Sequence, residues 1–402
     1  MAINPSQIQA VLNSKRTDFS SFQESALSYL SQYDAAWAEW IASSAVERDR
    51  WIQTQRQKSD ADATVLGALP LEAVSPSDHG IIRSHLSWDN REQSLAWAGE
   101  QLKALTTFAV DGSQVFQQKD FSIPIALVQI GWFENHHCAE GLYEKDVLLD
   151  VMTPKDLVAD RSQPMDRWID MRRFSMEVQR LIAYIKQAKD RAMQQGRDPE
   201  RCLVFFDGSL VLSFASMLVD NIREPYIEQL LMLLQASEKH QVPLVGYVDT
   251  AQSNDITTLL RLFHGLENTR SLHDAKLLNR WMQWGDRTPL MVCNRGGILN
   301  EYREMADCLT FTYLKTNANY PARVELPKWV WDAGLADRVI NQVRAEVIVG
   351  NGYPYAIETA DQTAVLQSRD RQIFYRIFQD WAEREQLPLR LSQKMMSKAR
   401  RR

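Results

Sequence analysis

The tripeptide Asp-Gly-Ser occurs twice, each time directly after an apolar run typical of a buried strand. Asp111-Gly-Ser follows Phe-Ala-Val, and Asp207-Gly-Ser follows Leu-Val-Phe-Phe. Aspartates at the ends of neighbouring strands can converge on one point, where their charges would repel each other unless a cation lay between them. The pattern therefore predicts a divalent metal site at Asp111 and Asp207. The alternative is that Asp-Gly-Ser simply forms a favourable turn at both positions.

Glu177 is a third candidate, on a helix predicted over Met165–Gln194. This helix carries an apolar stripe at helical spacing, formed by Phe174, Val178, Leu181 and Ile185. Because Glu177 borders the stripe, its carboxylate can reach over the sheet that the helix covers. The alternative is a surface ion pair with Arg173 or Arg180, which lie within one helical turn of Glu177.

Several functional classes are excluded by motifs that the sequence lacks. It has no G-x-x-x-x-G-K-[ST] loop, so the chain is not itself a P-loop motor, and no G-x-S-x-G or Rossmann glycine motif. The histidines have no H-E-x-x-H spacing, and the 4 cysteines include no C-x-x-C pair. The cysteine pattern argues against both a zinc ribbon and a disulfide framework.

The charge and hydropathy of the chain restrict how it can contact nucleic acid and where in the cell we expect it. Its formal net charge is −5, so any contact with nucleic acid must be local or assisted by a metal or a partner. The N-terminus lacks the apolar core of a secretory signal, and the longest mostly apolar runs are about half the span of a bilayer. We therefore expect a cytoplasmic protein that does not enter the membrane.

The elements that must position these residues follow an α/β pattern, in which apolar runs alternate with helical segments from Leu102 onward. Strands are predicted over 105–110, 123–133, 203–206, 243–248, 309–314 and 323–326. Helices are predicted over 165–194, 225–237, 335–349 and 363–384, with another ending at Leu218. We expect a helical N-terminal region and connector over 1–100, with the connector at 59–80. A main domain over 101–385 and a basic tail over 386–402 follow.

Taken in order, these motifs resemble the NurA nuclease family over roughly residues 102–374. The resemblance rests on the two Asp-Gly-Ser tripeptides, on Glu177 and on three later segments. These segments are Phe311-Thr-Tyr313-Leu-Lys315, Arg323-Val-Glu325-Leu-Pro327 and Gly352-Tyr-Pro-Tyr-Ala-Ile-Glu-Thr-Ala360-Asp361.

The resemblance implies a ribonuclease H-like core, a mixed β-sheet flanked by helices, in the main domain. It implies a nuclease that uses Mn²⁺ (or Mg²⁺), acts on DNA ends with 5′ to 3′ polarity and forms a homodimer. It also implies partnership with a HerA-type hexameric ATPase in double-strand break repair. By motif, Asp111, Glu177 and Asp207 would be metal ligands and catalytic residues, and Tyr313 would be a catalytic residue.

Two positions depart from the family pattern. Asp361 stands where the family usually has histidine, and Asp249, which follows the apolar residues 244–248, stands where lysine is common. An additional acid at each position indicates either retuned metal binding or drift of part of the site. We expect Asp361 to be a metal ligand and a catalytic residue. The alternative is that Asp361 caps a helix that begins near Thr363.

The expected activity is therefore that of a metal-dependent deoxyribonuclease, a 5′ to 3′ exonuclease with single-strand endonuclease activity as an addition. One rival is a catalytically silent adaptor that docks on the ATPase, against which the intact Asp111, Glu177 and Asp207 argue. The other rival is a metal-dependent phosphatase or nucleotidase, because strand-end aspartates also suit phosphate monoesters.

Overall fold

The structure, a computed structural model, describes residues 3–57, 65–117, 121–138, 140–158, 163–196 and 198–390. It divides into two compact units, each made of two separate stretches of chain. The first contains Met1–Ser87 and Val248–Val324, and the second contains Trp88–Tyr247 and Glu325–Arg402. These units do not follow the boundaries expected near residues 100 and 385, because the chain leaves each unit and re-enters it. The predicted basic tail lies outside the described residues from 391 onward.

Within the described residues, nine strands follow the hydrogen-bonded order β1-β7-β8-β9-β6-β5-β2-β3-β4. They are β1 (Gly67–Pro70), β2 (Thr106–Val115), β3 (Ala126–Asn135), β4 (Tyr143–Met152), β5 (Cys202–Asp207), β6 (Leu244–Val248), β7 (Met291–Asn294), β8 (Leu309–Leu314) and β9 (Ala322–Pro327). Parallel and antiparallel pairs both occur, so the sheet is mixed.

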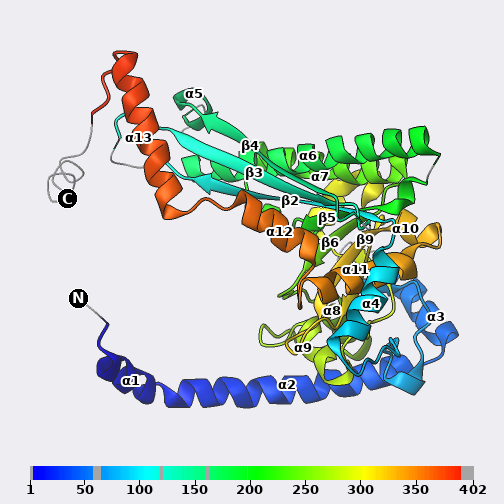
Figure 1. The fold of residues 1–402 in the computed structure, drawn as a ribbon. Helices are drawn as coiled ribbons and strands as arrows, with labels where there is room; N and C mark the ends of the chain where they lie inside the picture. Colours follow the sequence, from blue (N-terminus) through cyan, green and yellow to red (C-terminus); the bar gives the residue numbers. More distant parts are fainter. Residues whose placement is uncertain are drawn as a thin grey trace. The chain divides into compact units, whose positions relative to one another are not determined.

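The sheet of the second unit has the order β6-β5-β2-β3-β4 (Figure 1). β2, β3 and β4 form an antiparallel meander, whereas β5 pairs in parallel with β2 and with β6. An antiparallel meander extended by two parallel strands on the side of its first strand is the arrangement of a ribonuclease H-like core. The predicted fold class is confirmed.

Helices cover both faces of this part of the sheet. α6 (Met165–Gln195) packs on β2, β3 and β5 with α7 (Asp220–His240) beside it, and α12 (Tyr355–Ala364) packs on β2 and β3 (Figure 1). A Cβ placed on Gly112 would meet α6. Gly131 pairs with Asp111, the residue before Gly112, and a Cβ placed on Gly131 would meet α12. Since neighbouring residues of a strand face opposite sides, α6 and α12 lie on opposite faces.

The other helices of the second unit are α4 (Arg91–Leu102), α5 (Pro154–Leu157), α10 (Lys328–Asp332), α11 (Ala336–Val349) and α13 (Ser368–Arg384). α6 follows the prediction closely, because its apolar stripe is buried and the helix ends at Gly196. Gly196 has a φ of 61°, the left-handed conformation in which glycine commonly ends a helix.

The first unit contains the predicted N-terminal helices. They are α1 (Pro5–Ser14), α2 (Arg16–Ala42) and α3 (Ala45–Arg56), and the unit also holds α8 (Asp255–His264) and α9 (Asp274–Leu278). The end of α2 is held by Trp37 and Trp40, both buried, with the Trp40 ring 4.9 Å from that of Phe263 in α8. None of the helices in the described part of the chain combines the length and apolar character needed to cross a membrane.

Some predicted elements are wrong. The single helix expected over 363–384 is two helices, α12 and α13, because the chain is extended at Val365 between them. The helix expected to end at Leu218 is a 3-10 turn, Ser213–Met217. The predicted connector at 59–80 contains β1, and β4 was not predicted because its apolar residues do not alternate.

Candidate active site

A cavity of about 460 Å³ lies in the second unit where β2 and β5 separate. We call it the acidic pocket. Its charged lining residues are Asp111, Arg167, Asp170, Arg173, Glu177 and Asp207. Its lining also includes the aromatic residues Phe174, Phe206, Phe214 and Tyr226, which we call the aromatic wall.

Asp111 and Asp207 reach the acidic pocket because of strand register. β5 pairs with β2 up to the pair Val110–Phe206, after which β5 ends at Asp207 while β2 continues. Burial raises the pKa of Asp111 to about 6, and the nearby negative charge of Asp207 acts in the same direction. Of the two aspartates that the sequence singled out, Asp207 is therefore close enough to Asp111 to affect its ionisation.

Glu177 enters the acidic pocket from α6 and is only 9% exposed. Its approach depends on Gly112, since a Cβ at that position would lie 2.3 Å from Glu177 Oε1. Arg173 Nη1 donates a hydrogen bond of 2.6 Å to the same oxygen. Burial raises the pKa of Glu177 to about 7 despite the Arg173 charge, and Asp111 adds to the increase.

Of the two interpretations of Glu177, the ion pair is present, and the role in metal binding stays a prediction. The ion pair with Arg173 exists, but it is buried in the acidic pocket and not on the protein surface. Arg180 has a different environment, since its guanidinium carbon lies 4.1 Å from the centre of the Trp132 ring.

Asp361 lies in the last turn of α12, close enough to Asp111 for its carboxyl group to help raise the pKa of Asp111. Two neighbouring carboxylates repel each other, and a cation between them would relieve the repulsion. The capping interpretation is wrong, because Asp361 is inside a helix and the next helix, α13, begins after Gln367. Asp361 is exposed and does not line the acidic pocket itself.

The loop after β5 is held by contacts that the sequence did not predict. Gly208 has a φ of 137°, a conformation that other residues rarely adopt. Ser209 Oγ lies 3.0 Å from Glu325 Oε2, and the Leu210 amide donates to the same oxygen at 2.6 Å. Tyr353 Oη donates a hydrogen bond of 2.8 Å to Asp207 Oδ1. The turn interpretation of the second Asp-Gly-Ser thus applies to Gly208 and Ser209, while Asp207 lines the pocket. For the first tripeptide it is wrong, because β2 continues through Asp111, Gly112 and Ser113.

Tyr313 and Asp249 belong to the first unit and do not line the acidic pocket. Tyr313 is fully buried, and its hydroxyl donates a hydrogen bond of 3.0 Å to Asp274 Oδ2. Asp249 is half-buried and accepts a 3.4 Å hydrogen bond from Asn317 Nδ2. These contacts give both residues a structural role, so we leave them out of the candidate site.

The donor set of the site suits a hard divalent cation. Asp111, Glu177, Asp207 and Asp361 offer only carboxylate oxygens, the ligands that Mg²⁺ and Mn²⁺ prefer. A cation would offset the burial and repulsion that raise the pKa values of Asp111 and Glu177. Among the described residues, however, no three His, Cys, Asp or Glu side chains are arranged to hold a metal ion as they stand. Metal binding would therefore require side chains to turn, beginning with the Glu177 carboxylate that Arg173 now holds.

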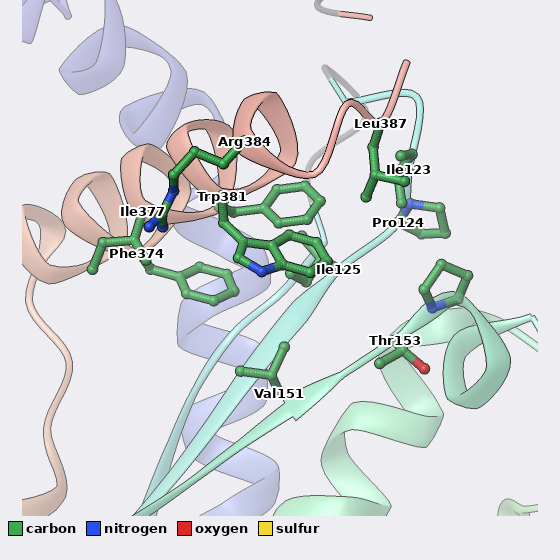
Figure 2. A pocket seen from close by; sticks show the side chains of 12 residues that line it. Ile123, Pro124, Ile125, Val151, Thr153, Phe374, Ile377, Trp381, Arg384 and Leu387 are labelled. Carbon is green, nitrogen blue, oxygen red and sulfur yellow. The ribbon is translucent and has the colours of Figure 1, made fainter. Parts of the chain in front are cut away.

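A second cavity, of about 640 Å³, lies between α13 and the ends of β3 and β4 (Figure 2). Its lining is apolar and includes Ile125, Val151, Ile377 and Trp381, with Arg384 as its charged residue. We call it the apolar groove. Because this lining is almost entirely apolar, with Thr153 and Arg384 as its polar residues, the groove is better suited to contact with another protein than to catalysis.

Comparison with known proteins identifies the chain. A cysteine-substituted catalytic domain of human Endonuclease V is 15% identical to it and covers 71% of this chain and 88% of that one. The TM-score is 0.32, too low to support an argument. No curated protein sequence matches significantly. The family model of the NurA domain matches residues 105–366, which is more than half of the sequence and includes every residue of the acidic pocket. The chain therefore belongs to the NurA family of nucleases.

Proposed function

We propose that this nuclease hydrolyses phosphodiester bonds of DNA in the acidic pocket, with the help of Mn²⁺ or Mg²⁺. The observation that carries the proposal is the group of carboxyl groups of Asp111 within β2, Glu177 on α6 and Asp207 at the end of β5. Asp111 and Glu177 are held there with pKa values raised to about 6 and about 7, first of all by burial. Such a group is unfavourable alone and becomes favourable around a divalent cation.

The carboxylates of the candidate site and two of their neighbours each have a part in this proposal. Asp111, Glu177 and Asp207 would hold the cation, with Asp361 completing the oxygen shell from α12. A bound divalent cation lowers the pKa of an attacking water and stabilises the leaving oxygen. Arg173 positions Glu177, and Tyr353 orients Asp207 through its 2.8 Å hydrogen bond.

We further propose that the enzyme works on DNA ends with 5′ to 3′ polarity, as a homodimer and with a HerA-type hexameric ATPase. Family membership supports these points. The net charge of −5 fits weak DNA binding by the nuclease alone, so the ATPase would deliver the substrate. The apolar groove, together with exposed Leu149, which shares a face of the edge strand β4 with the groove residue Val151, is a surface that a protein partner would cover.

The test is a cleavage assay with linear DNA, single- and double-stranded and labelled at either end. We expect cleavage with Mn²⁺ or Mg²⁺, none with EDTA, and loss of at least about 100-fold in Asp111→Asn and Asp207→Asn. Circular dichroism should show that both variants fold. Near wild-type cleavage by either variant would remove that residue from the site.

Two controls separate the rival functions. Hydrolysis of p-nitrophenyl phosphate without DNA cleavage would favour a phosphatase. Absence of both activities, with binding to the ATPase retained, would favour a silent adaptor.

A further inference from the structure

The aromatic wall of the acidic pocket is not explained by hydrolysis of a phosphodiester. The rings of Phe174 and Tyr226 are 4.7 Å apart, and those of Phe214 and Tyr226 are 5.4 Å apart at 89°. The Phe206 ring joins the wall at 6.2 Å from Phe174. A metal-dependent hydrolase needs charged and polar groups around the phosphate, so an aromatic surface in the same cavity indicates a further ligand group.

The aromatic residues of the wall lie close in sequence to the carboxylates of the site, on the same elements. Phe206 directly precedes Asp207 on β5, and Phe174 lies one helical turn before Glu177 on α6. Phe214 follows the Asp207 loop on the 3-10 turn Ser213–Met217. The same elements therefore set the position of the rings relative to the carboxylates, as a site for one ligand with an anionic and an aromatic part would require.

Exposure distinguishes Phe214 from the rest of the wall. Phe174, Phe206 and Tyr226 are buried, whereas Phe214 is 46% exposed at the rim of the cavity. Stacking of a flat ligand on this ring would remove apolar surface from water. Among the charged lining residues, Arg173 Nε is buried and has no hydrogen-bond partner within the described part of the chain, an unfavourable state that an anionic ligand group would relieve.

The size of the cavity limits the ligand. About 460 Å³ is within the range of small-molecule sites and far too small for duplex DNA. It suits a single nucleotide, whose phosphate is anionic and whose base has a flat face. We infer that the aromatic wall is a base-binding subsite, in which an unpaired nucleobase next to the scissile phosphate stacks on Phe214. This inference rests on the proposed function and makes an unpaired nucleotide, at a single strand or a frayed end, the true substrate.

The test compares oligonucleotides that carry either a base or an abasic residue at the cleaved position. We expect removal of the base to lower kcat/KM of the wild type on the order of tenfold, as for a single base–aromatic stacking contact. Phe214→Ala should lower kcat/KM by a similar factor with the base present and should not distinguish the two substrates. Phe214→Leu keeps apolar packing but lacks the ring, so it should behave like the alanine variant.

Met217→Ala is the matched control. Met217 lies on the same 3-10 turn, is 85% exposed and does not line the acidic pocket, so this variant should discriminate as the wild type does. If base removal has the same effect in the wild type and in Phe214→Ala, the wall only packs the 3-10 turn against α7, and the inference is wrong.

A binding experiment separates this inference from the proposed function. Fluorescence anisotropy with Asp111→Asn and the same two single-stranded oligonucleotides measures the base dependence without cleavage. Base-dependent binding that Phe214→Ala abolishes would support the subsite even if no metal-dependent cleavage were found. If Asp111→Asn binds the two oligonucleotides equally well, with or without the added Phe214→Ala change, the subsite is wrong even if cleavage is confirmed.

Discussion

Replacement of Gly112 by alanine tests the geometry of the acidic pocket most directly. Gly112 follows Asp111 on β2 and faces α6, and an added Cβ would lie 2.3 Å from Glu177 Oε1 and 2.7 Å from Arg173 Cγ. The Glu177 carboxylate is held by Arg173 and cannot withdraw without loss of their 2.6 Å hydrogen bond. The substitution therefore adds one methyl group between β2 and α6, next to Asp111 in the chain and in contact with Glu177.

The expected effects can be worked from these distances. Ordinary contacts begin near 3.4 Å, so the carboxylate must move by about 1 Å. Insertion of a methyl group into a well-packed site costs about 1–3 kcal/mol of unfolding free energy. A displacement of about 1 Å in a catalytic group can lower activity on the order of 100-fold. We expect Gly112→Ala to fold, with a lower Tm, and to lose most of its cleavage activity.

The measurements are thermal unfolding and the single-turnover cleavage rate with saturating Mn²⁺. Gly99→Ala is the matched control, because Gly99 lies in α4 and a Cβ there would meet nothing within 4 Å. That control should keep full activity and gain up to about 1 kcal/mol, since alanine is favoured over glycine in helices. Wild-type cleavage by Gly112→Ala would show that the placement of Glu177 does not matter for the reaction, and our account of the site would fail.

Three further predictions concern charge, pH and assembly. Asp361→Asn removes a charge without altering size, so we expect slower cleavage and a higher Mn²⁺ requirement. Unchanged metal titration curves would exclude Asp361 as a ligand. Folded-state pKa values raised to about 7 for Glu177 and about 6 for Asp111 mean that the folded state holds these protons more tightly than the unfolded state. In EDTA, stability should thus fall as pH rises from about 5 to 8, and Glu177→Gln should flatten a plot of Tm against pH. If Glu177→Gln leaves the slope of Tm against pH unchanged, other groups cause the pH dependence of stability. In light scattering the wild type should be a dimer, and Ile377→Glu, in the apolar groove, should be a monomer. Ile373→Glu, on the same helix but outside the groove, should stay dimeric. A monomeric wild type would remove the dimer proposal.

The sequence alone determined the features that depend on neighbouring residues. The apolar runs before Asp111 and Asp207 predicted two buried strands, and the structure has β2 and β5 there. β5 ends at Asp207 as expected, whereas the strand end predicted at Asp111 is wrong, because β2 continues to Val115. The stripe beside Glu177 and the glycine at 196 predicted the extent of α6 to within one residue. Side-chain periodicity and helix-ending glycines are local signals, so strands and helices can be recognised without a fold.

Only the tertiary structure decided the environment of these side chains. Burial of Glu177 and its raised pKa depend on Gly112, which is distant in sequence and approaches only when α6 packs on β2. Tyr313 matched a family motif, yet its hydroxyl is bonded to Asp274 in the core of the first unit. The aromatic wall gathers residues from β5, α6, α7 and the turn at Ser213–Met217, with no common motif to mark them. Solvation, ionisation and ligand contact depend on which segments meet in space, and those contacts come from packing between elements that no local pattern records.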